Sequence, residues 1–330
     1  MPDFVTGGSG FVGGAVVRHL VGSGTDVRAL VRSEAAAASV AGLGARPVRA
    51  DLHDVAALRS AMEGCEVVYH VAGVNTMCPR DPGEMYRTNV DAVRDVVRAA
   101  AAAGAGRIVL TSSVAAVGEP AGVVASEDTR HSGSYLSHYA RSKHLGEVAF
   151  FEEAARVGIE AVAVNPSSVQ GPGRADGSAL LLRYALNAAR PVAVDTVLSI
   201  VDIDDAARAH LLAAAYGRPG GRYLISETSL WLRDVLHALD VATGRPVRPI
   251  LLPRWVAASA GPLTALGRLL PGNAPLCREM LRTLLHGHRI DASRSVTELG
   301  MTYTPLGETL ARTVAWLDGA GYIKELPPAR

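Results

Sequence analysis

Three polar residues in the middle of the chain have the types and spacing that proton transfer to a carbonyl oxygen requires. Tyr139 and Lys143 are four residues apart, so on a helix they share one face. A neighbouring ammonium group stabilises a phenolate and lowers a tyrosine pKa that is otherwise about 10. Ser113 follows an apolar run, where its hydroxyl could polarise a carbonyl oxygen. Tyr135 lacks this context, because the residue four positions after it is Tyr139 and not a lysine.

A glycine-rich turn near the N-terminus has a second chemical use. Residues 6–13 read TGGSGFVG, between a short apolar run and a helical pattern. Glycine lets the backbone turn tightly and approach a pyrophosphate closely, and the free N–H groups at the start of a helix favour the anion. The turn therefore predicts a dinucleotide site that includes Gly7, Gly10, Phe11, Val12 and Gly13.

The residue after the second predicted strand bears on the choice of cofactor. An acid at this place binds the ribose 2′-hydroxyl of NAD, whereas an arginine accommodates the 2′-phosphate of NADP. This chain has Arg32 there. We therefore expect NADP, with NAD still possible because Glu34 lies close enough to reach a ribose.

Strand and helix patterns alternate through the first half of the chain. The expected strands cover residues 4–6, 27–31, 47–50, 67–72, 108–112 and 161–165, and the expected helices cover 11–20, 33–43, 55–63, 83–103 and 139–156. This alternation predicts an α/β fold with a doubly wound parallel sheet. We expect a dinucleotide-binding domain over residues 1–165. Residues 166–330, richer in Gly and Pro, are expected to form mainly a smaller substrate-binding lobe, with late strands and helices that return to the first domain.

Composition argues against several other classes of protein, namely nucleic-acid-binding, secreted and membrane-spanning proteins. The 33 basic and 32 acidic residues give a net charge of +1, so no nucleic-acid partner is expected. Cys65, Cys78 and Cys277 cannot all pair and have no metal-ligand spacing, which favours a reducing cytosol. No signal peptide is visible. The apolar segment 255–267 is shorter than the about 20 residues that span a bilayer, so we expect it to cover a pocket instead.

Two further groups of residues are expected to be structural. His286 and His288 form an HxH pattern with no third ligand nearby, so we expect a loop or surface position and predict no metal site. Asp202, Asp204 and Asp205 precede an alanine-rich run. They are expected to cap a helix and to supply its acidic first turn.

With these residues in place, the chain resembles the extended short-chain dehydrogenase/reductase family, part of the NAD(P)-dependent epimerase/dehydratase superfamily. The matching segments are TGGSGFVG, Asp51-Leu52, HVAG at 70–73, TNVDAV at 88–93, TSSVAAVG at 111–118, YARSK at 139–143, NPSSVQGPG at 165–173, VDIDDAARAH at 201–210 and DASRSVTELG at 291–300. The resemblance implies a Rossmann-type fold and catalytic roles for Ser113, Tyr139 and Lys143, with Asn89 in a proton relay.

The resemblance also implies further contacts with the cofactor. Asp51 and Leu52 should bracket the adenine, and Val71, Ala72 and Gly73 should lie beside the adenine-side ribose. Pro166 to Val169 should pass beside the nicotinamide, while Lys143 should also hold a ribose. Gln170 and Val117 depart from the family, which commonly has tyrosine at both positions.

The substrate side differs from that of sugar-nucleotide enzymes in the family. Those relatives use arginines to neutralise a diphosphate, but this chain has Leu198 near the first expected arginine, and Arg289 precedes isoleucine rather than a glycine-aspartate pair. Apolar residues are available instead, namely Val197, Leu198, Leu230, Trp231 and Trp255. The chain is thus most similar to the dihydroflavonol-reductase and 3β-hydroxysteroid-dehydrogenase branch, whose lid region residues 252–281 resemble.

The expected activity is NADPH-dependent reduction of a ketone or aldehyde on an apolar small molecule, or the reverse oxidation. Tyr139 would donate the proton, Ser113 would hold the developing alkoxide and Lys143 would tune Tyr139. One alternative is a nucleotide-sugar epimerase or dehydratase that recycles its bound NAD(P). A non-catalytic NADP sensor is the other, and the intact Tyr139 and Lys143 argue against it. A cytoplasmic homodimer, formed through the helices over 83–103 and 139–156, is also expected.

Overall fold

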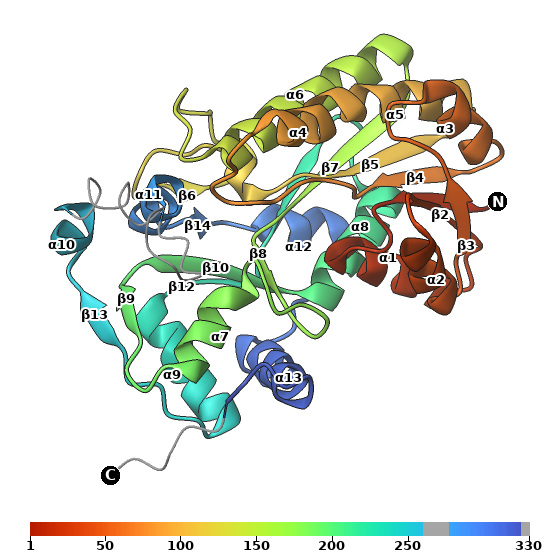
Figure 1. The fold of residues 1–330 in the computed structure, drawn as a ribbon. Coiled ribbons are helices and arrows are strands. Elements are labelled where there is room, and N and C mark those ends of the chain that lie inside the picture. The colour runs from red at the N-terminus through yellow and green to blue at the C-terminus, as the bar shows by residue number, and fades with distance from the viewer. Residues whose placement is uncertain (260–276, 325–330) are drawn as a thin grey trace.

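A seven-stranded sheet forms the centre of the computed structural model, which describes residues 1–259 and 277–324 (Figure 1). Its strand order is β11-β7-β5-β4-β1-β2-β3, and every neighbouring pair is parallel. The strands are β1 (Asp3–Thr6), β2 (Val27–Val31), β3 (Arg46–Arg49), β4 (Val67–His70), β5 (Arg107–Thr111), β7 (Glu160–Pro166) and β11 (Arg222–Ile225). The predicted doubly wound parallel sheet is confirmed.

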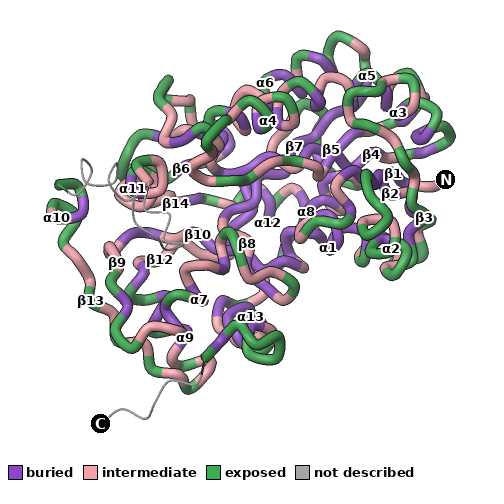
Figure 2. The backbone as a smooth tube through the Cα atoms, viewed as in Figure 1, coloured by how far each residue is buried: buried purple, intermediate pink, exposed green. Residues whose placement is uncertain are grey.

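Helices cover both faces of this sheet because successive strand side chains point to opposite sides. Phe4 packs with α3 (Val55–Met62), α5 (Ala92–Ala102) and α6 (His138–Val157), whereas the next residue, Val5, packs with the helices of the other face. Those helices are α1 (Phe11–Gly22), α2 (Glu34–Gly42), α8 (Ile203–Tyr216) and α12 (Ser293–Leu299). In Figure 2 the buried segments concentrate on the strands between these two layers.

The helix predicted over residues 83–103 is present, but a π-helical turn that was not predicted interrupts it. The segment divides into α4 (Gly83–Tyr86), a π-helical turn η1 (Arg87–Asp91) and α5. Close packing against α6 explains the interruption, because a Cβ added at Gly146 would lie 2.0 Å from the Asn89 carbonyl oxygen. Such π turns recur at functional sites, and this one carries Asn89.

A smaller lobe lies beyond the carboxyl edge of the sheet. Its three-stranded sheet has the order β12-β10-β8, with β8 (Ser168–Gln170), β10 (Val197–Asp202) and β12 (Thr228–Trp231). A separate apolar core joins it to α7 (Ala179–Asn187), α9 (Leu232–Thr243) and α13 (Leu306–Gly319). Two short pairs complete it, β9 (Val192–Val194) with β13 (Ile250–Leu252) and β6 (Val124–Ala125) with β14 (Arg289–Ile290).

Asp202 caps α8, as predicted, and accepts a hydrogen bond from the Asp204 amide at 2.8 Å. The segment 255–267, which was expected to cover a pocket, is described only as far as α10 (Arg254–Ser259). Residues 260–276 of the expected lid region lie outside the described residues. Within α10, Trp255 is 75% exposed and borders neither of the two cavities described below, so its expected place in a substrate pocket stays a prediction.

A disulfide joins the two halves of the chain. Cys78 follows β4 and pairs with Cys277, just before α11 (Arg278–His286), across 199 residues and a Cα separation of 6.2 Å. Cys65 is buried and free. Nothing in the cysteine spacing predicted this pair.

Over residues 1–259 and 277–324, no helix is both long and apolar enough to cross a bilayer.

Candidate active site

The three residues expected to do the chemistry meet at the carboxyl end of β5. Ser113 lies two residues past that strand and is buried. Tyr139 is in the first turn of α6 and receives a hydrogen bond from the Ser113 side chain that acts on its pKa. Lys143, one turn further along α6, donates from Nζ to the Thr111 carbonyl oxygen at 2.7 Å. The fold therefore brings a phenol, a hydroxyl and an amine to one edge.

A buried polar chain fixes the position of Ser113. The Asn165 amide, at the end of β7, donates to the Ser113 carbonyl oxygen at 3.0 Å and to Oε2 of Glu147 at 2.6 Å. Glu147 is itself buried on α6, and its Oε1 accepts from Arg222 of β11 at 3.1 Å. Because a buried carboxylate needs a partner of opposite charge, Arg222 compensates the charge of Glu147. These hydrogen bonds link β7, α6 and β11 around the site.

Burial sets the acid-base properties of Tyr139 and Lys143. Burial raises the pKa of Tyr139, while the Ser113 hydrogen bond and the Arg174 charge act in the opposite direction. For Lys143, burial lowers the pKa to about 8, although the nearby Glu147 carboxylate opposes this. Tyr139 is thus a neutral proton donor at pH 7 and Lys143 is mostly an ammonium ion. The expected lowering of the Tyr139 pKa by Lys143 stays a prediction.

Asn89 supports the backbone beside the catalytic residues. Its side chain accepts from the Val74 amide and donates to the Val74 carbonyl oxygen, both at 2.8 Å. It also donates to Oγ of Ser142 on α6 at 2.9 Å. In this arrangement its described contacts go to residues 74 and 142, and its predicted part in a proton relay stays a prediction.

The glycine turn has the shape that a dinucleotide needs. Gly7 has a φ of +71°, and a Cβ there would lie 2.7 Å from the Ala72 amide nitrogen. A Cβ on Gly13 would lie 2.1 Å from the Gly7 carbonyl oxygen. Gly10 precedes α1 without a side-chain cap, so the first N–H groups of the helix remain available to an anion. These residues fit the diphosphate of a nicotinamide dinucleotide.

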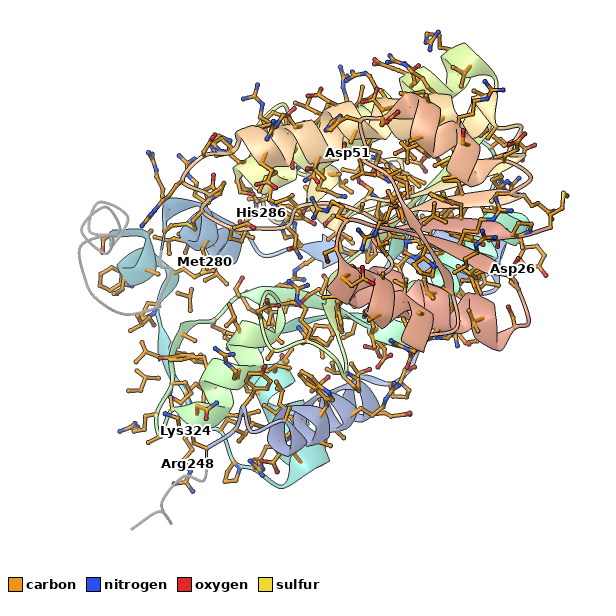
Figure 3. The ribbon with its side chains drawn as sticks, turned by 45° about the vertical axis from the view of Figure 1, so that its right-hand side comes forward. Asp26, Asp51, Arg248, Met280, His286 and Lys324 are labelled. Carbon is orange, nitrogen blue, oxygen red and sulfur yellow. A yellow bond between two sulfur atoms is a disulfide. The ribbon has the colours of Figure 1, made fainter. Side chains whose placement is uncertain are left out.

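The other predicted cofactor contacts lie in or just after strands, most of them at this same edge. They are Arg32 after β2, Asp51 and Leu52 after β3, Val71 to Gly73 after β4, Pro166 at the end of β7 and Val169 in β8. A Cβ on Gly73 would lie 3.8 Å from Nζ of Lys143, so this row reaches the catalytic residues. Figure 3 labels Asp51 beside the parallel sheet and His286 at the end of α11, on the side of the smaller lobe.

Glu34 and Arg32, the two residues that could contact the adenosine ribose, differ in whether they have a partner of opposite charge. Glu34 forms an ion pair with Arg49, which ends β3. Arg32 is exposed and forms no ion pair within residues 1–259 and 277–324. The acid that could have held a ribose hydroxyl is therefore engaged elsewhere, and the arginine is not.

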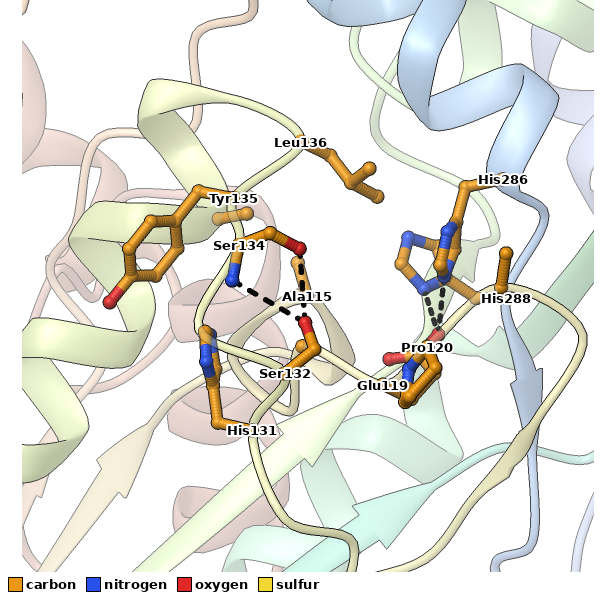
Figure 4. Close-up of a pocket in the computed structure, with 13 residues that line it drawn as sticks. Ala115, Glu119, Pro120, His131, Ser132, Ser134, Tyr135, Leu136, His286 and His288 are labelled. Atoms are coloured by element: carbon orange, nitrogen blue, oxygen red, sulfur yellow. Dashed lines mark hydrogen bonds and ion pairs between the residues drawn. The ribbon is translucent and has the colours of Figure 1, made fainter.

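Two cavities that share His288 lie beside the segment after β5 that carries Ser113. One, of about 160 Å³, has mostly apolar walls that include Val114, Val197, Leu198 and Leu284. Leu198 and Val197 thus lie where apolar substrate contacts were expected. The other, of about 280 Å³, borders Ala115, Ala140 and a group of polar residues that are shown in Figure 4. His288 borders both cavities.

Sequence reasoning missed residues that only the fold brings near Tyr139 or to the wall of a cavity. Arg174 lies with its guanidinium 5.8 Å from the centre of the Phe11 ring and acts on Tyr139 through its charge. The expectation that His286 and His288 have no third partner is also wrong, because Glu119 lies between them. Burial would raise the pKa of Glu119, but the hydrogen bonds from both histidines and the His288 charge lower it to about 2. The HxH pattern pointed to the two histidines, but no local pattern pointed to Glu119.

Comparison with known proteins adds a family and several relatives. Residues 4–226 match the NAD dependent epimerase/dehydratase family. The chain is 34% identical to a Synechocystis protein provisionally named dihydroflavonol 4-reductase, covering 97% of this chain and 96% of the relative. It is 32% identical to sterol demethylase protein B of Methylococcus capsulatus, with 98% and 100% covered, and 29% identical to cinnamoyl-CoA reductase 1 of Petunia hybrida, with 97% and 92% covered.

Solved structures agree on the fold. The crystal structure of gox2253 superimposes with a TM-score of 0.86 at 29% identity, covering 98% of this chain and 99% of the other. A nucleoside-diphosphate-sugar epimerase from Pseudomonas aeruginosa gives a TM-score of 0.79 at 24% identity, with the same coverage. At that identity the second match shows the shared architecture alone.

Proposed function

Because this chain belongs to the NAD-dependent epimerase/dehydratase family and is an NAD(P)-dependent enzyme of the extended short-chain dehydrogenase/reductase type, we propose that it reduces a ketone or aldehyde on an apolar small molecule with NADPH. The observation that carries the proposal is the meeting of Ser113, Tyr139 and Lys143 beside a cavity with apolar walls. The reverse oxidation uses the same residues.

The chain's own residues would handle the proton and the developing charge. Tyr139, neutral because burial raises its pKa, donates its phenol proton to the carbonyl oxygen. Ser113 donates a hydrogen bond to the same oxygen as negative charge develops there. Lys143 keeps two donors after its bond to the Thr111 carbonyl, enough for a ribose hydroxyl and for the phenolate of Tyr139. The bound nicotinamide would supply the hydride.

NADP is the proposed cofactor. The glycine turn and the start of α1 would hold the diphosphate, and the residues after β3, β4 and β7 would line the adenosine and nicotinamide. Arg32 supports a 2′-phosphate because it is exposed and not paired with a described acid, while Glu34 is engaged by Arg49. A carboxylate free to hold the ribose 2′-hydroxyl would instead have favoured NAD.

The proposed substrate class follows from the cavity walls and from the names of relatives. Val197, Leu198 and Leu284 offer apolar surface next to the catalytic edge. Relatives named dihydroflavonol 4-reductase, cinnamoyl-CoA reductase and ketoreductase support carbonyl reduction on a carbon-rich skeleton. A nucleotide-sugar epimerase or dehydratase is the rival, because the family that the chain matches is named for epimerases and dehydratases.

A screen of substrate classes separates these two functions. The purified protein is given NADPH with a panel of lipophilic ketones and aldehydes, or nucleotide sugars with catalytic NAD(P). Absorbance of the reduced cofactor is followed, and the nucleotide sugars are separated by chromatography to detect conversion. The proposal predicts stoichiometric loss of NADPH with an apolar carbonyl compound. Isomerisation or dehydration of a nucleotide sugar without net cofactor use, and no turnover of the carbonyl panel, would overturn it.

We also propose a cytoplasmic homodimer formed through α5 and α6. These two helices pack against each other on one face of the sheet, and Val148 on α6 is 40% exposed. The Cys78–Cys277 disulfide argues against the compartment, because a reducing cytosol keeps thiols reduced. Light scattering tests the dimer, and thiol labelling of protein taken directly from the cell tests the compartment.

A further inference from the structure

The strongest unassigned cluster is the carboxylate of Glu119 between two imidazoles. Oε1 of Glu119 lies 3.2 Å from Nε2 of His286 and 2.6 Å from Nδ1 of His288. The side chains are 1%, 9% and 17% exposed, so the group is largely removed from water. Figure 4 shows both rings directed at the carboxylate on one side of the cavity of about 280 Å³.

Two glycines impose this arrangement on distant parts of the chain. Gly287, between the histidines, has a φ of +66°, and a Cβ there would lie 2.9 Å from Oγ1 of Thr196 and 3.0 Å from the Val197 amide nitrogen. The sharp turn at Gly287 therefore leaves both imidazoles facing the same side. Gly118, with a φ of +65°, likewise turns the chain just before Glu119. The cluster is held by backbone conformation rather than by flexible side chains alone.

Hydrogen bonding leaves half of the carboxylate unused. Both imidazoles contact Oε1, while Oε2 of Glu119 is buried and has no hydrogen-bond partner among the described residues. An unpartnered buried carboxylate oxygen is costly and calls for a ligand. The cavity beside it is bordered by all three residues of the cluster, so a ligand can reach that side.

The chemistry of the three groups matches that of a zinc-type ion. Two imidazoles and one carboxylate are a common ligand set for Zn²⁺, with bonds of about 2.0–2.2 Å and a fourth position open to water or substrate. Ligand atoms around a tetrahedral ion of that size are about 3.3 Å apart. The nitrogens already lie 3.2 and 2.6 Å from Oε1, and one ligand atom from each residue can be chosen so that all lie within 4.8 Å of one another. Small side-chain movements would suffice.

We propose that Glu119, His286 and His288 form a binding site for a divalent transition-metal ion of the zinc type, with its remaining position open to the cavity. The ion would replace the hydrogen bonds that the imidazoles now share on one carboxylate oxygen. It would tie the loop after β5 to the turn between α11 and β14. A donor atom from the cavity, either water or an oxygen of a small molecule, would complete its coordination.

A second cluster of possible ligands must be distinguished from this one. Cys78, Cys277 and Glu279 also lie within ligand reach of one another. In the described structure these cysteines form a disulfide, which removes both thiolates as ligands. Reduction would restore them, so the test includes a variant without this pair.

The test measures metal binding directly, with no turnover, so its outcome is independent of the proposed reductase activity. Full-length protein without an affinity tag is stripped with a chelator and titrated with Zn²⁺ by calorimetry and with Co²⁺ by visible absorbance. Glu119→Gln and His288→Gln remove ligands. His131→Gln, a change at another histidine of the same cavity, and the Cys78→Ser/Cys277→Ser double variant serve as matched controls.

Wild-type protein and both controls are expected to bind one Zn²⁺ per chain, with the intense visible bands of four-coordinate Co²⁺. Each ligand variant is expected to lose at least about 100-fold in affinity, beyond what removal of a supporting contact costs. No stoichiometric binding by the wild type, or equal binding by Glu119→Gln and His288→Gln, would overturn the proposal. If either variant does not fold, the wild-type stoichiometry and Co²⁺ spectrum decide alone.

Discussion

The carboxyl edge of the parallel sheet and the wall of the larger cavity both gather polar side chains, but over different distances along the chain. At the edge, Tyr139 and Lys143 are four residues apart on one helix, and most of the predicted cofactor contacts lie at or just after the end of a strand. At the cavity wall, Glu119 meets His286 across 167 residues. Chemistry carried by local spacing can be recognised in a sequence, whereas chemistry assembled by the fold cannot.

Replacing one tyrosine at each place gives the largest expected contrast. Tyr139→Phe should lower kcat about 10²- to 10⁴-fold, because it removes the proton donor while keeping the ring. Tyr135→Phe, a change in the wall of the larger cavity, should leave kcat within a few-fold of wild type. Steady-state NADPH oxidation measures both, and fluorescence titration checks that NADPH binding is retained. Equal losses in the two variants would remove the distinction between the regions.

Two ion pairs, one near the carboxyl edge of the sheet and one in the smaller lobe, should contribute differently to the free energy of unfolding. Glu147→Gln should lower the free energy of unfolding by about 3–5 kcal/mol, because it leaves Arg222 beside a buried site without its charge partner. Asp195→Asn breaks the pair with Arg233 in the smaller lobe, where Arg233 is 55% exposed, and should cost about 1 kcal/mol or less. Urea unfolding of both variants checks this. Similar losses in the free energy of unfolding would mean that the buried ion pair stabilises the protein no more than the exposed one.

Variants at Arg32 and Arg49 test the proposed preference for NADPH over NADH. Arg32→Ala should weaken NADPH binding about 10- to 100-fold and leave NADH binding unchanged, since a charge-assisted contact with a phosphate contributes about 1.5–3 kcal/mol. Arg49→Ala is the comparison: it releases Glu34 from its ion pair, so NADPH binding should stay within a few-fold of wild type and NADH binding should not weaken. Dissociation constants for both nucleotides provide the measurement. Parallel weakening of NADH and NADPH by Arg32→Ala would contradict the assigned role.

The pH dependence of reduction should follow Lys143. Its pKa is lowered to about 8 by burial, and in the proposed mechanism the ammonium form would hold the ribose and stabilise the phenolate. The proton is present below that pKa and lost above it, so kcat/KM should be constant near pH 7 and fall as pH rises through about 8, by about tenfold per unit. A pH profile of kcat/KM that rises over this range would contradict it.

Much of the fold followed from the sequence because its signals are local. The strand and helix periods of the first half, the glycines of residues 7–13 and the Tyr139–Lys143 spacing all act within a few residues. The π turn at Asn89 was missed because it depends on the approach of Gly146 from another helix. Glu119, Arg174 and the Cys78–Cys277 pair were missed for the same reason, since only the folded chain brings their partners near.

Transfer of deuterium from NADPH that carries deuterium at both C4 positions of the nicotinamide tests the proposed carbonyl reduction most directly. An apolar ketone found in the screen is incubated with the labelled cofactor and the enzyme, and the alcohol is examined by mass spectrometry. The account predicts one deuterium at the former carbonyl carbon for each NADPH consumed. Conversion of a nucleotide sugar with no net loss of cofactor, and no deuterium in any alcohol product, would contradict it.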